Sequence, residues 1–215
     1  MLRPAEVFID IETIPGPQKP RLEDIPAPGN YKDPSKIQAY KEGKLEEAYR
    51  SQALDSMAGE LLAIGIAIDD EPAQVEIRGL NGRDTELDLL AWLVNRTKNL
   101  SPIMWVGHNV KSFDLQWIWR RCIQTGLYEL ARKIPRERYS KQIIDTMELW
   151  AGPDYRDRTS LSKIAKFLSL DGKPEGMDGS KVYDAYIAGD LKSIAAYCAH
   201  DVDLTRKIFR QIEGL

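Results

Sequence analysis

Cysteine is scarce in this 215-residue chain, which contains only Cys122 and Cys198. The two lie far apart in the sequence and lack the paired spacing that zinc sites and disulfide frameworks require. The sequence therefore argues against a structural metal held by sulfur, and it suits a reducing cytoplasm.

Long apolar runs and an excess of one charge are also missing. No run of about 18 apolar residues occurs, and the first residues do not combine a basic segment with an apolar stretch of signal-peptide length. The 30 basic and 33 acidic side chains give a formal charge of −3, which is not the basic balance of proteins that grip long duplexes by releasing counterions. We expect a cytoplasmic protein without a membrane partner, whose contacts with any nucleic acid are local.

The length and the hydrophobic content of 43% predict one well-packed domain over residues 1–215. The segment from Pro17 to Met57 departs from this pattern, because it contains several prolines and then carries seven basic and seven acidic side chains. We interpret it as an insertion. Its second half, from Ser35 to Met57, has loose helical periodicity, which fits a solvated helix and would also allow a lid or a clamp.

Alternating patterns along the rest of the chain predict an α/β fold with a mixed five-stranded sheet flanked by helices. Short β-branched or apolar runs predict the strands, of which the first three should be adjacent. These strands cover residues 7–11, 61–68, 74–80, 103–106 and 143–144. Helical spacing predicts a helix that opens at Ser112 or Asp114, and others over residues 84–99, 160–168, 180–188 and 191–212.

Two carboxylates, Asp10 and Glu12, stand two residues apart at the end of the first strand. Side chains alternate along a strand, so both should point to one face and can share a metal. The apolar neighbours Val7, Phe8 and Ile9 indicate a central strand, where buried acids need cations. A turn or capping role stays open, because acids are common at strand ends.

A second cluster, Gly107–Asp114, follows a strand and opens a helix. Asp114 should project from the start of that helix near the end of the sheet, although an acid there also suits the helix dipole. Asn109 could equally cap a turn and Phe113 could be a core residue. We assign no catalytic role to His108.

Tyr197 and Asp201 form a third cluster inside the last helix. Their i, i+4 spacing stacks them on one face, so that a phenol meets a carboxylate. Alternatively, Tyr197 is an amphipathic core residue and Asp201 a solvated acid with a basic partner. Asp203 suits the solvated role better.

Four acids drawn together suit phosphodiester hydrolysis, which spreads negative charge over the transferring phosphate. Two divalent cations about 3.5–4 Å apart stabilise the attacking and leaving oxygens, and carboxylates are the oxygen ligands that such cations prefer. A neighbouring hydroxyl, here that of Tyr197, need only hold the attacking water in line. Without metal, the four acids would repel one another and some would protonate.

Together, the three clusters resemble the Exo I, II and III motifs of the DEDD superfamily of proofreading exonucleases. The segments Phe8–Thr13, Gly107–Asp114 and Tyr197–Val202 are similar to those of stand-alone exonucleases related to the proofreading domain of family-B DNA polymerases. Further segments resemble the same family: Asp145–Thr146, Ser160–Leu161, Ile164–Ala165, Gly172–Lys173 and Gly179–Val182. The resemblance implies a ribonuclease H-like fold.

The resemblance also implies a role for each residue of the motifs. Four acids match the ligands of two divalent cations, Mg²⁺ or Mn²⁺: Asp10, Glu12, Asp114 and Asp201. Tyr197 matches the water-orienting tyrosine of the DEDDy branch, because Ala196 stands where the other branch has histidine. Thr13 and Asn109 match contacts to the 3′-terminal nucleotide, and Phe113 would stack or wedge against bases.

A basic cluster lies between residues 132 and 141, where five cations face the single acid Glu137 and leave a charge of +4. These cations are Arg132, Lys133, Arg136, Arg138 and Lys141. Such a run is often a solvated loop. We favour guidance of a phosphate backbone, because a nuclease site is independently indicated.

The expected activity is a metal-dependent 3′-5′ exonuclease that releases nucleoside monophosphates from the 3′ ends of single-stranded DNA, with replication or repair proteins as partners. A 3′-5′ exoribonuclease remains an alternative, because discrimination of the 2′-hydroxyl depends on pocket contacts that a sequence does not reveal. A non-catalytic nucleic-acid-binding module on the same fold is a third interpretation, against which the intact acids argue.

Overall fold

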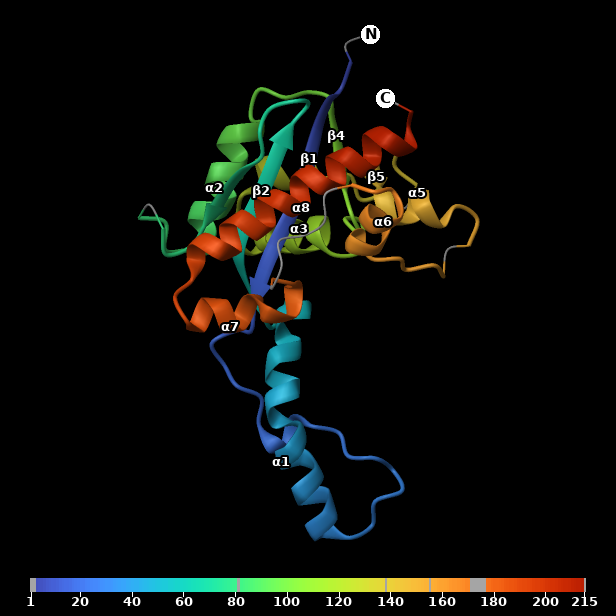
Figure 1. The fold of residues 1–215 in the computed structure, drawn as a ribbon. Helices are drawn as coiled ribbons and strands as arrows, with labels where there is room; N and C mark the ends of the chain where they lie inside the picture. The colour runs from blue at the N-terminus through green and yellow to red at the C-terminus, as the bar shows by residue number, and fades with distance from the viewer. Residues whose placement is uncertain (1–2, 81, 138, 155, 171–176, 215) are drawn as a thin grey trace. The chain divides into compact units, whose positions relative to one another are not determined.

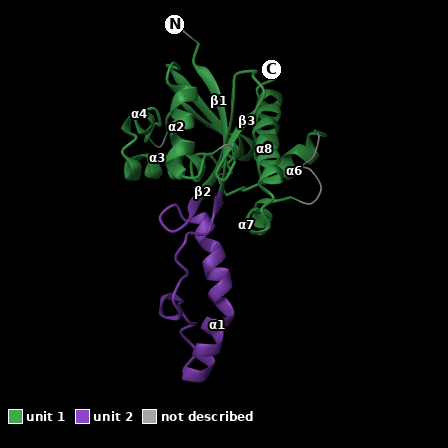
Figure 2. Cartoon of the chain, turned by 90° about the vertical axis from the view of Figure 1, so that its left-hand side faces the viewer, with its two compact units in different colours: residues 1–12, 61–215 green, residues 13–60 purple. Residues whose placement is uncertain are grey.

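The computed structural model describes residues 3–80, 82–137, 139–154, 156–170 and 177–214. The chain separates into two compact units, one of residues 1–12 and 61–215 and the other of residues 13–60 (Figure 2). The predicted insertion at about 17–57 falls inside the smaller unit. Arg138 and Gly172–Lys173, which the sequence analysis names, lie outside the described residues.

Five strands form one sheet in the order β3-β2-β1-β4-β5 (Figure 1). They are β1 (Ala5–Ile14), β2 (Glu60–Ile68), β3 (Gln74–Ile77), β4 (Ile103–Gly107) and β5 (Ile143–Asp145). β4 pairs in parallel with both β1 and β5, whereas β2 and β3 are antiparallel. The predicted mixed sheet, with its first three strands adjacent, is thus confirmed, and β1 lies in its centre.

Helices cover both faces of the sheet. α2, α3 and α4 lie on one face, and α6 and α8 lie on the other (Figure 1 and Figure 2). The helices of the larger unit are α2 (Glu86–Thr97), α3 (Asp114–Thr125), α4 (Tyr128–Ala131), α5 (Thr146–Ala151), α6 (Leu161–Phe167), α7 (Val182–Ile187) and α8 (Leu191–Ile212).

Side-chain alternation along β1 sorts its residues between two hydrophobic cores. Val7 and Ile9 belong to the core that includes residues of α2 and α3. Phe8 packs instead with Val202 and Phe209 of α8. Even-numbered residues of β1 therefore face α8, and this face includes positions 10 and 12.

Several helices and strands begin or end at residues that differ from the prediction, because local interactions set these boundaries and hydrophobic periodicity does not reveal them. α2 begins at Glu86, two residues after the predicted start, because Thr85 and Asp88 form a reciprocal capping box. The predicted strand over 74–80 ends at Ile77, and Gly79 follows with a positive φ of 83°. The predicted helix over 180–188 is divided into a 3₁₀ turn, Gly179–Lys181, and α7.

Two short helices, α4 and α5, are additions to the sequence prediction. They contain four and six residues, which is too short for an apolar period of 3.6 to register. The long helix α8 matches its predicted range of 191–212. None of the described helices combines the length and apolarity needed to cross a bilayer.

The smaller unit contains one long helix, α1 (Pro34–Ser51), and two 3₁₀ turns, η1 (Leu22–Asp24) and η2 (Gln52–Leu54). Asp33 caps α1 by accepting a hydrogen bond from the amide of Ser35. The predicted helix over 35–57 is therefore confirmed in its first part and ends earlier. α1 has no buried residue, which agrees with the prediction of a solvated helix.

Candidate active site

The two acids of β1 share the face that the strand presents to α8. Ligand atoms of Asp10, Glu12 and Cys198 all lie within 4.8 Å of one another. Glu12 is only 7% exposed and Asp10 is half-buried. The alternation along β1 therefore gathers two carboxylates beside a residue of α8, as a shared metal site requires.

Asp114, the first residue of α3, is held against the same strand. Its Oδ1 accepts a hydrogen bond of 3.0 Å from the amide of Ile11, between the two acids of β1. The last residue of β1 that is paired with β4 is Phe8, so the Ile11 amide lies beyond the part of β1 that pairs with β4. Asp114 is 3% exposed and forms no ion pair with a basic side chain of the described residues. Burial, together with the nearby carboxylate of Asp145, raises the pKa of Asp114 to about 7.

Asp145 shapes the turn that leads into α3. Its two carboxylate oxygens accept hydrogen bonds from the amides of Asn109 at 2.8 Å and Lys111 at 3.1 Å. It also caps α5 by accepting from the amide of Met147. Asn109 has a positive φ of 61°, a backbone conformation that asparagine tolerates better than most residues. This role of Asp145 was not predicted from the sequence, although an acid between a short strand and a helix is a recognisable cap signal.

His108 stabilises the same region. Its ring nitrogens lie 3.0 Å from the Thr146 hydroxyl and 3.1 Å from the Thr159 carbonyl. Both nitrogens are thus engaged in contacts that hold this turn to α5 and to the segment before α6.

α8 supplies Tyr197 and Asp201, which are both 5% exposed. They stand one helical turn apart in α8, and the Asp201 carboxylate is near enough to raise the pKa of the phenol, so the predicted i, i+4 proximity is present. Burial, followed by the nearby carboxylates of Asp201, Glu12 and Asp10, raises the pKa of Tyr197 far above its ordinary value. The phenol therefore keeps its proton and can donate it in a hydrogen bond beside the acids of β1.

Cys198 is a member of the cluster to which the sequence analysis assigns no role. Its Sγ lies 3.7 Å from the backbone oxygen of Asp10. The approach of α8 depends on Gly65 of β2, because a Cβ at that position would lie only 2.8 Å from the Cys198 Sγ and 3.0 Å from Val202 Cγ2. A glycine within an apolar strand is the sequence signal for such a close approach.

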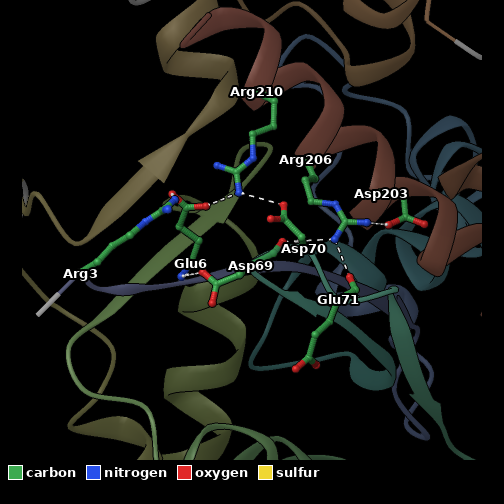
Figure 3. Close-up of polar contacts among 8 residues, drawn as sticks. All are labelled: Arg3, Glu6, Asp69, Asp70, Glu71, Asp203, Arg206 and Arg210. Carbon is green, nitrogen blue, oxygen red and sulfur yellow. Dashed lines mark hydrogen bonds and ion pairs between the residues drawn. The ribbon is translucent and has the colours of Figure 1, made fainter. Parts of the chain in front are cut away.

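The second half of α8 is fixed to the sheet by two arginines (Figure 3). Arg210 Nη2 lies 2.5 Å from Glu6 Oε2 at the start of β1. Arg206 Nη1 donates to the carbonyls of Asp69 and Glu71, in the turn between β2 and β3. These contacts hold α8 along β1 and its neighbour, and so determine where Tyr197 and Asp201 lie.

The three residues that the resemblance matches to substrate contacts have other contacts in this structure. Thr13 belongs to the smaller unit, where its hydroxyl donates to a backbone carbonyl. The ring of Phe113 packs against the core, with its centroid 6.0 Å from that of Trp117. The side-chain oxygen of Asn109 accepts a hydrogen bond of 3.3 Å from Arg158.

The family of the chain follows from a comparison of its sequence with family models. Residues 52–213 match the model described as a predicted 3′-5′ exonuclease related to the exonuclease domain of PolB. The chain belongs to this family. The match includes Asp114, Tyr197 and Asp201, and it begins after the two acids of β1.

A solved structure with a similar fold is the family B DNA polymerase from the hyperthermophilic archaeon Pyrobaculum calidifontis, with a TM-score of 0.60 at 15% identity. The alignment covers 98% of this chain and 24% of the polymerase chain, so the chain spans about a quarter of that structure. The similarity establishes the ribonuclease H-like fold. No curated protein sequence matches the chain.

Proposed function

We propose that this chain is a metal-dependent 3′-5′ exonuclease of the DEDDy type, which releases nucleoside monophosphates from the 3′ ends of single-stranded DNA. Membership of the family supports nuclease activity in general. The observation that carries the finer proposal is the hydrogen bond between the Ile11 amide and Asp114, which ties α3 to the strand that bears Asp10 and Glu12.

The donor set suits hard divalent cations. Asp10, Glu12, Asp114 and Asp201 would hold two Mg²⁺ or Mn²⁺ ions through carboxylate oxygens, the ligands that these ions prefer. A buried carboxylate without a basic partner is costly, and a nearby cation would remove the cost at Asp114. When bound, the two ions would stabilise the negative charge that develops on the attacking and leaving oxygens.

Tyr197 would orient the attacking water. Its protonated phenol, near Asp201, can share a hydrogen bond with a water molecule next to the acids of β1. Asn109 and Phe113 stand in the turn that ends at Asp114, and Thr13 follows Glu12 in the chain. On the resemblance of their motifs, we assign Thr13 and Asn109 to the 3′-terminal nucleotide and Phe113 to stacking or wedging against bases.

The decisive experiment digests 5′-labelled single-stranded DNA and RNA of the same sequence side by side, with Mg²⁺, Mn²⁺ or a chelator. We expect a metal-dependent ladder that shortens from the 3′ end of the DNA, while a closed circular strand stays intact. If only the RNA were degraded, the protein would be an exoribonuclease and the proposal of a DNA exonuclease would be wrong. Strand binding without any degradation would indicate a non-catalytic module.

Variants test the assignment of the residues. Asp114→Asn should lower turnover by about a thousandfold, since metal-assisted charge stabilisation contributes several kcal/mol. Tyr197→Phe should lower it by about a hundredfold. The matched control is Asp203→Asn, which removes an acid from the same helix and should retain most of the activity.

Metal binding has a readout independent of turnover. Mn²⁺ should raise the melting temperature of the wild-type protein, because a ligand that binds only the folded state stabilises it. The rise should shrink strongly in Asp10→Asn. Equal shifts in both proteins, or full turnover in Asp114→Asn, would disprove the proposed site.

A further inference from the structure

A basic pocket lies on the face of the sheet that α3 covers. Its volume is about 610 Å³, and it is lined by the second half of α3, by α4, by the loop that follows α4, by Gln142 and by residues 100–103, where β4 begins. Large apolar side chains are exposed at its wall, since Ile123 is 41% and Tyr128 is 52% exposed. Three members of the predicted basic cluster line it together with the acid Glu137, and two of these three, Arg132 and Arg136, have exposed side chains.

The two arginines are available to bind an anion. Neither forms an ion pair with an acid of the described residues. The Arg136 guanidinium lies 4.1 Å from the centroid of the Trp119 ring and donates a hydrogen bond of 2.9 Å to Gln116. A planar cation fixed on an aromatic ring is a surface on which a nucleobase can stack.

Not every member of the basic cluster has this freedom. Lys133 Nζ donates to the backbone carbonyls of Thr97, Lys98 and Leu100, so its charge stabilises the segment that follows α2. Lys141 does not line the pocket. Among the members of the predicted cluster that the structure describes, Arg132 and Arg136 therefore remain as candidates for binding an anion.

Hydrogen bonds connect this pocket with the candidate active site. Gln116, which holds Arg136, donates to the carbonyl of Lys111 at 3.1 Å. The amide of Lys111 is in turn held by Asp145, which also fixes the turn that precedes Asp114. A continuous set of contacts therefore runs along α3 from the pocket to the turn.

The distance along α3 from Asp114 to the pocket corresponds to a few nucleotides of single-stranded DNA. Trp119 and Ile123 follow Asp114 by five and nine residues, which at 1.5 Å per residue is about 8 and 14 Å along the helix axis. At about 3.4 Å per stacked nucleotide this corresponds to two to four nucleotides.

We propose that the pocket binds the single strand about two to four nucleotides on the 5′ side of the scissile bond. Arg132 and Arg136 bind phosphates, and the Arg136–Trp119 pair stacks a base. The proposal rests on the proposed exonuclease function. A nucleic acid is favoured over a protein partner because the contacts lead to the candidate active site and because the cation is stacked on an aromatic ring.

The test measures binding of labelled single-stranded DNA of about two and about 12 nucleotides by fluorescence anisotropy at several salt concentrations. All proteins carry Asp114→Asn, which prevents digestion. The test variant adds Arg132→Gln and Arg136→Gln. Its matched control adds Lys166→Gln and Lys192→Gln, which remove two exposed charges from α6 and α8 on the other face of the sheet.

We expect the arginine variant to bind the longer strand more weakly than the parent does, and to bind the shorter strand equally well. Loss of two phosphate contacts should reduce the slope of log K against log salt by about 1.4, which corresponds to about 25-fold weaker binding at 0.1 M relative to 1 M salt. The control variant should keep the parent slope.

Three outcomes would overturn the proposal. The first is an unchanged salt slope in the arginine variant, which would favour a protein partner for the pocket. The second is an equal loss of affinity for both strand lengths. The third is that the parent protein does not bind the longer strand. Failure of the proposed function is distinguishable, because the wild-type protein would then degrade nothing while the arginine-dependent binding persisted.

Discussion

Gly65 of β2 marks a point where α8 approaches the sheet closely, and Gly65→Ala tests how the site is assembled. The added Cβ would lie 2.8 Å from Cys198 Sγ and 3.0 Å from Val202 Cγ2. Carbon atoms in favourable contact are about 3.5–4.0 Å apart, so the α8 side chains must withdraw by roughly half an ångström or more. Such a withdrawal moves the helix that carries Tyr197 and Asp201.

Two opposing effects determine the magnitude. Overpacking a core by one methyl group costs about 1–3 kcal/mol, whereas removing the backbone freedom of a strand glycine contributes about 0.5–1 kcal/mol of stability. We expect a net destabilisation of about 1–2 kcal/mol for Gly65→Ala. Nuclease activity should fall further, by up to about a hundredfold, because a misplacement of about 1 Å is enough to disturb a catalytic geometry.

Urea unfolding of a double-mutant cycle checks the cause. If Gly65→Ala acts by crowding Cys198, the double variant with Cys198→Ala should be no less stable than Cys198→Ala alone. The coupling energy then equals the whole cost of Gly65→Ala, about 1–2 kcal/mol. Gly179→Ala is the control, because no atom lies within 4 Å of a Cβ at residue 179. The reasoning is refuted if Gly65→Ala is as stable as the control or if the two changes are additive.

Two further predictions concern the supports of the site. Burial raises the pKa of Glu6, but hydrogen bonds from Arg210 and Arg3 outweigh it and leave the pKa below the ordinary value of 4.5. The stability that Glu6 contributes is therefore complete above that value and is lost as pH falls through the folded-state pKa. In a plot of the free energy of unfolding against pH, Glu6→Gln should make the decrease at acid pH less steep. A curve parallel to that of the wild type would contradict this prediction. Asp145→Asn should lower the free energy of unfolding by denaturant by about 1–3 kcal/mol and should also lower nuclease activity. The reason is that an amide has one acceptor oxygen, whereas the carboxylate accepts from Asn109 and Lys111 through two. Unchanged activity would show that the turn does not need this contact.

Local patterns in the sequence predict most of the larger unit. The period of α8 predicts its range because its apolar side is buried, and the alternation along β1 predicts that Asp10 and Glu12 share a face because the strand is central. The i, i+4 proximity of Tyr197 and Asp201 is equally local. Each of these features depends only on residues that are near one another in the chain.

Long-range contacts are the part that such patterns omit. The bond from Ile11 to Asp114 joins residues 103 positions apart, and the approach of Cys198 to Gly65 joins two elements whose packing no single pattern describes. Asp145 supports the turn at Asn109 from another strand. A glycine in a strand and an acid after a strand are visible in the sequence, but their partners become apparent only in the folded chain.

The contacts of Arg210 explain why the last acid arrives at the first two. α8 runs opposite to β1, since Arg210 pairs with Glu6 and Cys198 contacts Asp10. Four residues of β1, from Glu6 to Asp10, cover about 13 Å, whereas twelve residues of α8, from Arg210 back to Cys198, cover about 18 Å. The helix therefore crosses the strand at an angle, and Asp201 lies in the part of α8 between the two contacts that fix the helix on β1. Changes at Arg210 should therefore act on the site through the position of α8, although Arg210 itself lies about two and a half helical turns from Asp201.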